Sequence, residues 1–413
     1  MKLINEEKHS YTQLLSLPVL VAAMGYFVDI YDLLLFSIVR IPSLKGLHVP
    51  AIQLLEKGVF LINIQMGGML IGGILWGVIG DKRGRLAVLF GSITLYSLAN
   101  IASGFIVSVD QYALLRFIAG IGLAGELGAG ITLVAEILPK AIRGYGTSIV
   151  AAVGLLGAVL AYLIADAFDW KMAYIIGGGM GVALLLLRFN VLESGMFSHV
   201  KEKNIKRGNI RALFTSSQRF IKYLRCIMIG LPIWFVIGIL LTFSPEFGKA
   251  LGISVSVNAG KAVMFGFIGL SLGDISSGLI SQYLKSRKKV VLIFLILTSL
   301  AISLFLLQES KDIIIFYGLC LLLGFSIGFW ALFVTIAAEQ FGTNLRATVA
   351  TSAPNFVRGS INIFAPLFLL GKGYWGVLPA AGAVGAFSIV LALGALWKIE
   401  ETFHKDLNYL EPE

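Results

Sequence analysis

The chain has 413 residues, of which 57% are apolar and only 14% are charged, and its formal net charge is +10. Soluble domains carry about 25% charged residues, so this composition, with a mean hydropathy of +0.88, excludes a pair of soluble domains and predicts an integral membrane protein. The positive charge does not indicate a nucleic-acid partner, because the lysines and arginines gather between the predicted membrane spans.

Apolar runs recur along the whole chain, and a membrane helix needs about 20 such residues. A polar linker near 191–225 divides the runs six and six. The sequence therefore predicts an all-α membrane protein with a six-helix bundle at 1–190, a second bundle at 226–398 and a tail at 399–413. The predicted spans are 14–40, 57–79, 86–107, 111–135, 145–166, 172–190, 226–248, 259–283, 290–308, 312–337, 347–370 and 374–397.

The distribution of lysine and arginine predicts the orientation of these spans. Of the 33 lysines and arginines, 23 lie on the side of the termini, Arg188 among them, about eight lie on the opposite side, and Arg116 and Arg358 lie within spans. Positive residues favour the cytoplasmic side, so both termini are expected to be cytoplasmic. The residues before the first span are polar, and no cleavable signal peptide is expected.

The two halves carry matching sequences at the end of their fourth spans. AEILPKAIRG contains Glu136 and Arg143, and AEQFGTNLRA contains Glu339 and Arg346 at the same spacing. The shared position, spacing and Ala-Glu start favour an internal repeat, and hence two pseudo-symmetric bundles.

These segments resemble a known family. WGVIGDKRGRL, beginning at Trp76, is similar to the loop between the second and third helices of the major facilitator superfamily, and RFIAGIGLAGELGAG resembles its fourth helix. AEILPKAIRG, LESGMF and EETFHKDL resemble segments of its sugar-porter and metabolite–proton symporter branch. The resemblance implies the major facilitator fold, with two bundles that give alternating access to a central site.

Two spans of this chain differ from the patterns of related transporter groups and so limit the kinds of transporter that the sequence can encode. The seventh span, IGLPIWFVIGILLTF, lacks the glutamines of sugar porters, which argues against a sugar substrate. The fifth span, AAVGLLGAVLAYL, lacks the Gly-Pro motif of drug–proton antiporters.

Asp29 and Asp32 lie near the middle of the first span. Ionisable residues inside a span are costly and are functional candidates by default. At a spacing of i and i+3 the two carboxylates share a helix face, which favours a proton-carrying group because both cannot ionise easily. The alternative is a permanent structural bridge from one aspartate to Arg116 or Arg40.

Glu126 and Arg116 lie in the glycine-rich fourth span, whose Gly120, Gly122 and Gly125 are expected to allow close helix packing. The family resemblance implies that charged residues of the first and fourth helices serve proton coupling. It thus assigns that role to Asp29, Asp32, Arg116 and Glu126, the alternative being a charge network that only fixes packing.

Arg358 lies within the eleventh span between Asn355 and Asn362, at helical spacing. Its planar guanidinium suits a carboxylate, so the sequence predicts a substrate carboxylate site. The alternative is an ion pair with Asp274 or with a carboxylate of the first half. Trp330 and Trp234 also lie inside spans and are expected either to line the cavity or only to pack.

The resemblance also implies a conformational latch between the halves on the cytoplasmic side, made by Asp81, Arg85, Glu136, Arg143, Glu339 and Arg346. The neighbouring Lys82 and Arg83 are better explained as a basic loop facing anionic lipid.

No enzyme, ATP-binding or metal-binding motif occurs, so neither catalysis nor a cofactor is expected. The sequence predicts a monomeric proton symporter of an inner (cytoplasmic) membrane, embedded in lipid and importing a small carboxylate-bearing metabolite such as an amino acid or a di- or tricarboxylic acid. Three alternatives stay open: an exporter or a transporter of a cationic or zwitterionic compound, an uncoupled facilitator, and a receptor that moves nothing.

Overall fold

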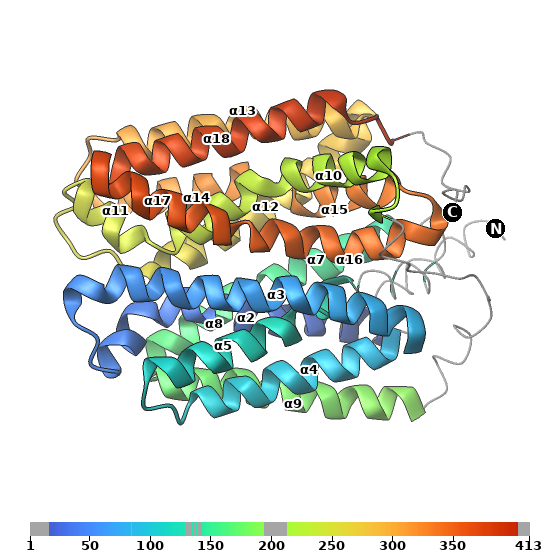
Figure 1. The fold of residues 1–413 in the computed structure, drawn as a ribbon, viewed down its shortest axis with the longest axis horizontal. Helices are drawn as coiled ribbons and strands as arrows, with labels where there is room; N and C mark the ends of the chain where they lie inside the picture. Colours follow the sequence, from blue (N-terminus) through green and yellow to red (C-terminus); the bar gives the residue numbers. More distant parts are fainter. Residues whose placement is uncertain are drawn as a thin grey trace, which may run out of the picture.

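A computed structural model describes residues 16–83, 85–128, 130, 134, 138, 143–193 and 213–403 of the chain. Throughout these ranges the regular structure is helical, and no strand occurs in them. The helices run side by side along the long axis of the molecule in two groups (Figure 1). The predicted all-α membrane fold is thereby confirmed.

The first half holds the helices up to residue 193. They are α2 (Leu17–Gly46), η2 (Ala51–Gln53), α3 (Leu54–Arg83), α4 (Arg85–Ser103), α5 (Val109–Leu123), α7 (Arg143–Leu155), α8 (Gly157–Ala167) and α9 (Trp170–Glu193).

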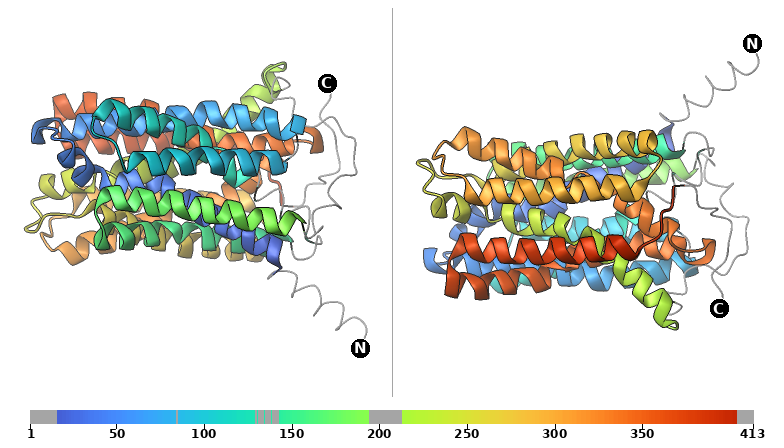
Figure 2. Two further views of the ribbon diagram at one scale, coloured as in Figure 1. Left: turned by 90° about the horizontal axis from the view of Figure 1, so that it is seen from below. Right: turned by 90° about the horizontal axis from the view of Figure 1, so that it is seen from above.

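The second half begins at Ser217. Its helices are α10 (Ser217–Phe235), η5 (Val236–Leu241), α11 (Ser244–Ala250), α12 (Ala259–Leu284), α13 (Arg287–Leu307), α14 (Ile313–Ser326), α15 (Trp330–Glu339), α16 (Thr343–Gly359), α17 (Ile361–Trp375) and α18 (Val377–Lys398). In the two views of Figure 2 the helices of both halves keep the same long axis.

Within the described ranges, nine segments are long and apolar enough to cross a membrane. A shorter apolar helix, Ala87–Ser103, is a tenth candidate. The two other predicted spans correspond to α5 and to the α16–α17 pair, which continues through Ser360 in helical conformation. The order of these segments agrees with the twelve predicted spans.

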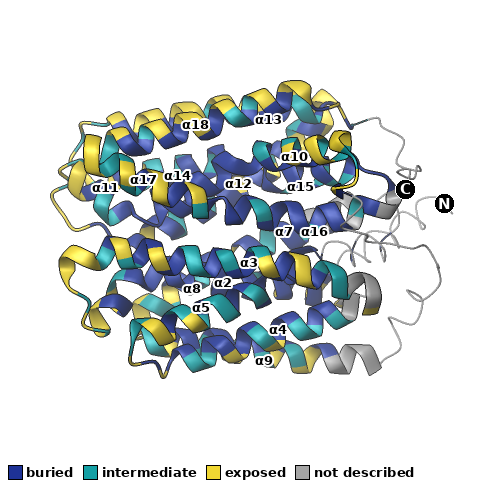
Figure 3. Cartoon of the chain, in the orientation of Figure 1, coloured by how far each residue is buried: buried dark blue, intermediate teal, exposed yellow. Residues whose placement is uncertain are grey.

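The side chains sort by burial as a membrane protein requires. Exposed residues lie on the outward faces of helices such as α13 and α18, and buried residues lie between the helices (Figure 3). Many outward residues are large and apolar, for example Leu279, Leu300 and Val390. In water such a surface would be unfavourable, whereas it matches the hydrocarbon of a bilayer.

Close helix packing accompanies the glycine-rich spans. A Cβ added to Gly120 of α5 would lie 2.1 Å from the carbonyl oxygen of Gln65 on α3. In the second half, a Cβ on Gly324 of α14 would collide with the backbone of Gly266 on α12. Only glycine permits these approaches.

Three sequence predictions about segment ends need correction. α2 continues to Gly46 and carries Arg40 as a fully buried residue, although the sequence ended the first span at residue 40 and counted Arg40 among the charges of the opposite side. Arg188, which the sequence counted among the charges on the side of the termini, is buried within α9. α10 begins at Ser217, inside the predicted linker, because hydropathy alone does not register an amphipathic helix start.

We name the two ends of the bundle by the helices that reach them. At the proximal end α2 begins and α18 ends, and at the distal end α2 ends and α11 lies (Figure 1). Contacts between the halves run from α12 to α2, α7 and α8, and from α3 to α16 and α17. The candidate site lies between these contacts.

Candidate functional site

Asp29 and Arg358 bring the two halves together near the middle of the bundle. Asp29 belongs to α2 and Arg358 to α16, and their Oδ2 and Nη2 atoms are 4.0 Å apart. Both side chains are almost completely buried. At 4.0 Å the pair attracts electrostatically without forming a hydrogen bond, so the two groups are neighbours whose hydrogen-bonding capacity is unused.

Several buried polar atoms around this pair have no hydrogen-bond partner among the described residues. They include both carboxylate oxygens of Asp29, all three nitrogens of the Arg358 guanidinium, and Nε1 of Trp234. Buried polar groups are nearly always satisfied by protein, water or a ligand. Unsatisfied donors gathered at one place therefore point to a group that binds there.

Two indole rings flank the Arg358 guanidinium. Its Cζ lies 5.8 Å from the ring centre of Trp234 and 5.6 Å from that of Trp330. Trp234 comes from α10 and Trp330 from the start of α15, so three helices of the second half surround the charge. Tyr26, one turn before Asp29, also lies within electrostatic reach of Arg358, a neighbour that the sequence reasoning missed.

Asp32 faces a different arginine from Asp29. The groups next to it are Arg116 of α5 and Asn100 of α4, and Gly177 of α9 leaves the space for its carboxylate. Asp32 is fully buried. Asp29 thus lies at the contact between the halves and Asp32 within the first half, and the two carboxylates stay within electrostatic reach of each other.

Arg116 is held by neutral groups of the first half. Its Nη2 donates to Asn100 at 2.6 Å and to Ser103 at 2.8 Å. The guanidinium carbon also lies 4.4 Å from the ring centre of Tyr174. These contacts fix Arg116 beside Asp32 and offer the aspartate a stationary positive charge.

Glu126 pairs with Arg188, a residue of the sixth predicted span that the sequence counted among the charges on the side of the termini. Oε1 of Glu126 is 2.6 Å from Nη2 of Arg188, and both side chains are buried. Arg188 donates a further hydrogen bond to the carbonyl of Leu89 on α4. The buried charge of Glu126 is therefore matched within the first half, across α4 and α9.

The other predicted residues of the second half have varied surroundings. Asn355 donates across the halves to the carbonyl of Ala124 at 2.9 Å. Asn362 donates to Gly359 of its own chain segment. Asp274 accepts the backbone N–H of Ala331 and so caps α15, while Arg358 has Asp29 as its ionic neighbour.

At the proximal end, Glu339 bridges to Arg287 at 2.7 Å, between α15 and α13 of the same half. Arg346 donates to the carbonyl of Phe341 and lies within electrostatic reach of Glu339. Among the predicted latch residues, Glu339 and Arg346 thus have their described partners within the second half. The side chains of Asp81, Arg85 and Arg143, and the whole of Glu136, lie outside the described residues.

Glu401, in the EETFHKDL segment, caps α13. Its carboxylate accepts the backbone N–H groups of Arg287 and Lys288 and the hydroxyl of Ser286. Partial burial opposes its ionisation, but these hydrogen bonds prevail and hold the pKa of Glu401 below its usual value.

The lowered pKa of Glu401 predicts a pH-dependent contribution to stability. The contribution is present above the carboxyl's ordinary pKa and is lost as pH falls through the lowered one. In detergent, Glu401→Gln should therefore lower the melting temperature at neutral pH, and the difference from wild type should vanish in strong acid. A difference that is equal at both pH values would contradict this assignment.

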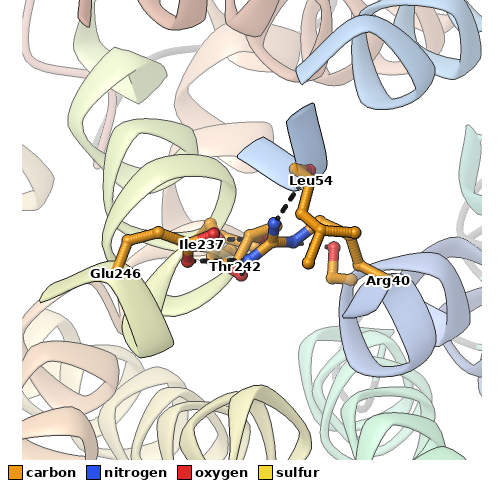
Figure 4. A network of polar contacts seen from close by, with 6 residues as sticks. Arg40, Leu54, Ile237, Thr242 and Glu246 are labelled. Carbon is orange, nitrogen blue, oxygen red and sulfur yellow. Dashed lines mark hydrogen bonds and ion pairs between the residues drawn. The ribbon is translucent and has the colours of Figure 1, made fainter. Parts of the chain in front are cut away.

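At the distal end a second ion pair joins the halves, and no sequence pattern predicted it. Nη2 of Arg40 is 2.7 Å from Oε2 of Glu246 on α11 (Figure 4). The signal available in the sequence was an arginine inside an apolar run, at FSIVRIP, with an acid after the helix-starting Pro245.

In the described part of the chain no cluster of His, Cys, Asp or Glu could hold a metal ion.

Comparison with known proteins agrees with this architecture. The model of the Major Facilitator Superfamily matches residues 20–366. The chain is 26% identical over 363 residues to the putative niacin/nicotinamide transporter NiaP of Bacillus subtilis, covering 84% of this chain and 86% of that protein. It is 26% identical over 374 residues to the benzoate transport protein of Acinetobacter baylyi, covering 80% and 78%.

Among solved structures, the proton:xylose symporter XylE bound to 6-bromo-6-deoxy-D-glucose superposes with a TM-score of 0.71 at 16% identity, over 96% of this chain and 98% of that one. At such low identity the likeness concerns the fold alone. The helices, the paired halves and the family match lead to one conclusion: the chain belongs to the Major Facilitator Superfamily and is a membrane transporter, not an enzyme.

Proposed function

We propose that this transporter imports a small aromatic monocarboxylate together with protons, by alternating access of its two halves to a site at Arg358. The observation that carries the proposal is the buried Arg358 guanidinium, whose nitrogens have no hydrogen-bond partner among the described residues. A planar guanidinium binds a carboxylate through two parallel hydrogen bonds. Trp234 Nε1 supplies a further free donor beside it.

The aromatic preference is supported by the walls of the site. Trp234 and Trp330 flank the guanidinium, and aromatic rings pack favourably by offset or edge-to-face contact. Relatives include proteins described as a niacin transporter and a benzoate transport protein, and both of these compounds are planar acids. With one arginine in the described centre, a monocarboxylate is also better matched than a di- or tricarboxylate.

Proton coupling is assigned to the buried carboxylates of the first half. Asp29 and Asp32 are fully buried, and a buried carboxylate strongly favours its neutral form unless a cation stabilises it. Each aspartate faces one arginine, Arg358 and Arg116 respectively. Glu126, which has Arg188 at 2.6 Å, is better suited to fixing the packing of the first half.

The orientation follows from the charge distribution. The excess of lysine and arginine between spans favours a cytoplasmic proximal end and thus cytoplasmic termini, in the inner membrane of a bacterium. The protein is proposed to act as a monomer within the bilayer, with the central linker and the tail on the cytoplasmic side.

Proteoliposome uptake tests the proposal. The panel contains labelled benzoate, nicotinate, glutamate, citrate and glycine betaine, each offered with and without an inward proton gradient. Accumulation of benzoate or nicotinate that stops when the gradient is collapsed is the expected result. Accumulation of glycine betaine alone would instead favour a zwitterionic substrate. Glycine betaine is included because the chain is 28% identical over 282 residues to a putative proline/betaine transporter of Staphylococcus aureus.

A further inference from the structure

We infer that Asp29 occupies, in the empty transporter, the place at Arg358 that the substrate carboxylate takes, and that a proton on Asp29 releases Arg358 for the substrate. This inference rests on the proposed function and specifies how its site is regulated. It follows from three observations: the spacing of the pair, the charge balance of the site, and the partners of the neighbouring acids.

The spacing leaves the pair easy to separate. Asp29 and Arg358 are 4.0 Å apart, and neither carboxylate oxygen of Asp29 accepts a hydrogen bond from the described residues. Separating them breaks no hydrogen bond, so the arginine can turn to another carboxylate. By contrast, Glu126 and Arg188 are 2.6 Å apart and hydrogen-bonded.

Charge balance then requires the proton. With Asp29 ionised, the pair is neutral and the site is satisfied electrostatically. Adding a substrate carboxylate would leave one cation facing two anions in a buried place, which is strongly unfavourable. One proton on Asp29 restores neutrality, so one proton accompanies each monocarboxylate.

No second cation near Asp29 replaces that proton in the described structure. The charged groups that face Asp29 are Arg358 from α16 and Glu126, and Glu126 is already matched by Arg188 of α9. Tyr26, on the same helix as Asp29, is an uncharged neighbour, and Asp274 of α12 lies within electrostatic reach of Tyr26. Asp32, the next acid on α2, faces Arg116.

Proton uptake on binding tests the exchange directly. Benzoate is added to the purified chain in weakly buffered detergent solution, and bound ligand and absorbed protons are measured together. The wild type should take up about one proton per benzoate at an alkaline pH at which Asp29 is ionised in the empty transporter, and fewer protons as the pH falls. Asp29→Asn, which mimics the protonated residue, should bind benzoate without proton uptake and with an affinity that no longer depends on pH. Asp29→Glu should restore the uptake.

The possible outcomes distinguish a failure of the proton-linked exchange at Arg358 from a failure of the carboxylate site. Benzoate binding with undiminished proton uptake in folded Asp29→Asn would overturn the exchange and leave the transport function standing. No binding of benzoate or nicotinate by the folded wild type at any pH would overturn the carboxylate site itself, and the exchange with it.

A second observation, independent of the first, concerns the distal end. Arg40 is fully buried and contacts both halves: its Nη1 points to the carbonyl of Leu54, and its Nη2 to the carbonyl of Thr242 and to Glu246 (Figure 4). Its guanidinium carbon also lies 4.7 Å from the ring centre of Phe243.

We propose that the Arg40–Glu246 pair is the distal gate, which must separate before this end of the transporter opens. Ser37 reinforces it, because the hydroxyl of Thr242 donates to the Ser37 hydroxyl at 3.1 Å across the halves. Parting the halves here would break the 2.7 Å ion pair between the buried Arg40 and the partly buried Glu246. The pair therefore favours the distally closed state.

Cysteine labelling tests the gate. Ser37→Cys places a reporter at the closed contact, and the two native cysteines, Cys226 and Cys320, are buried. Adding Glu246→Gln to this background should raise the labelling rate by a water-soluble maleimide about tenfold or more, because the open state gains population. Glu56→Gln, which removes an exposed acid in the first turn of α3 at the same end, is the matched control.

Unchanged labelling in monodisperse Glu246→Gln protein would overturn the gate. Equal increases in Glu246→Gln and Glu56→Gln would do the same, since they would reflect the general charge of this end rather than the pair.

Discussion

Replacing Arg358 by glutamine is expected to reduce carboxylate uptake by about 30-fold or more, since losing one partner of a buried charge pair costs about 2 kcal/mol or more. Glutamine keeps most of the volume but removes the positive charge that attracts a carboxylate. Lysine should restore uptake only in part, because a point charge does not reproduce the planar pair of donors. Initial uptake of labelled benzoate into proteoliposomes, normalised to the folded protein reconstituted, measures both effects.

Arg225→Gln is the control for this experiment. Arg225 lies on α10 and donates to the carbonyl of Lys398 near the proximal end, so its replacement removes an arginine without touching the centre. If Arg358→Gln transported benzoate at the wild-type rate, the substrate carboxylate would have to bind elsewhere, and the central ion pair would be structural.

The sequence predicted which charged residues form the central site, but it did not predict which of them pair with each other. Hydropathy is a local property, so an aspartate or arginine within an apolar run is visible at once, as Asp29, Asp32 and Arg358 were. The partner of each is set by how the halves pack. Nothing local connects Asp29, on the first span, with Arg358, on the eleventh.

Two arginines, Arg40 and Arg188, show the limit of reading span ends from hydropathy, because the sequence counted both among the charges outside the membrane core. The predicted first span ends at residue 40, yet α2 continues past Pro42 to Gly46. Arg188 lies just before the polar linker, and its burial depends on Glu126 at another place in the chain. In both cases a distant carboxylate makes the burial of a cation possible, and that carboxylate is not visible in the local sequence.

Replacing Glu126 or Arg188 is expected to have the second large effect, which is on the stability of the protein rather than on substrate binding. Removing either partner leaves an uncompensated buried charge, which costs about 3–5 kcal/mol. Glu126→Gln and Arg188→Met should each markedly lower the melting temperature in detergent. The double variant should recover most of the loss, because two neutral groups of similar volume replace the pair.

The recovery distinguishes a packing role from the proton-coupling role that the family resemblance implies for Glu126. A structural pair predicts that the double variant, once folded, still accumulates benzoate under a proton gradient. If instead Glu126→Gln were as stable as wild type and exchanged benzoate across the membrane without gradient-driven accumulation, Glu126 would be a proton carrier. Coupling would then pass through the first half by a second carboxylate, and the charge balance at Arg358 would account for only part of it.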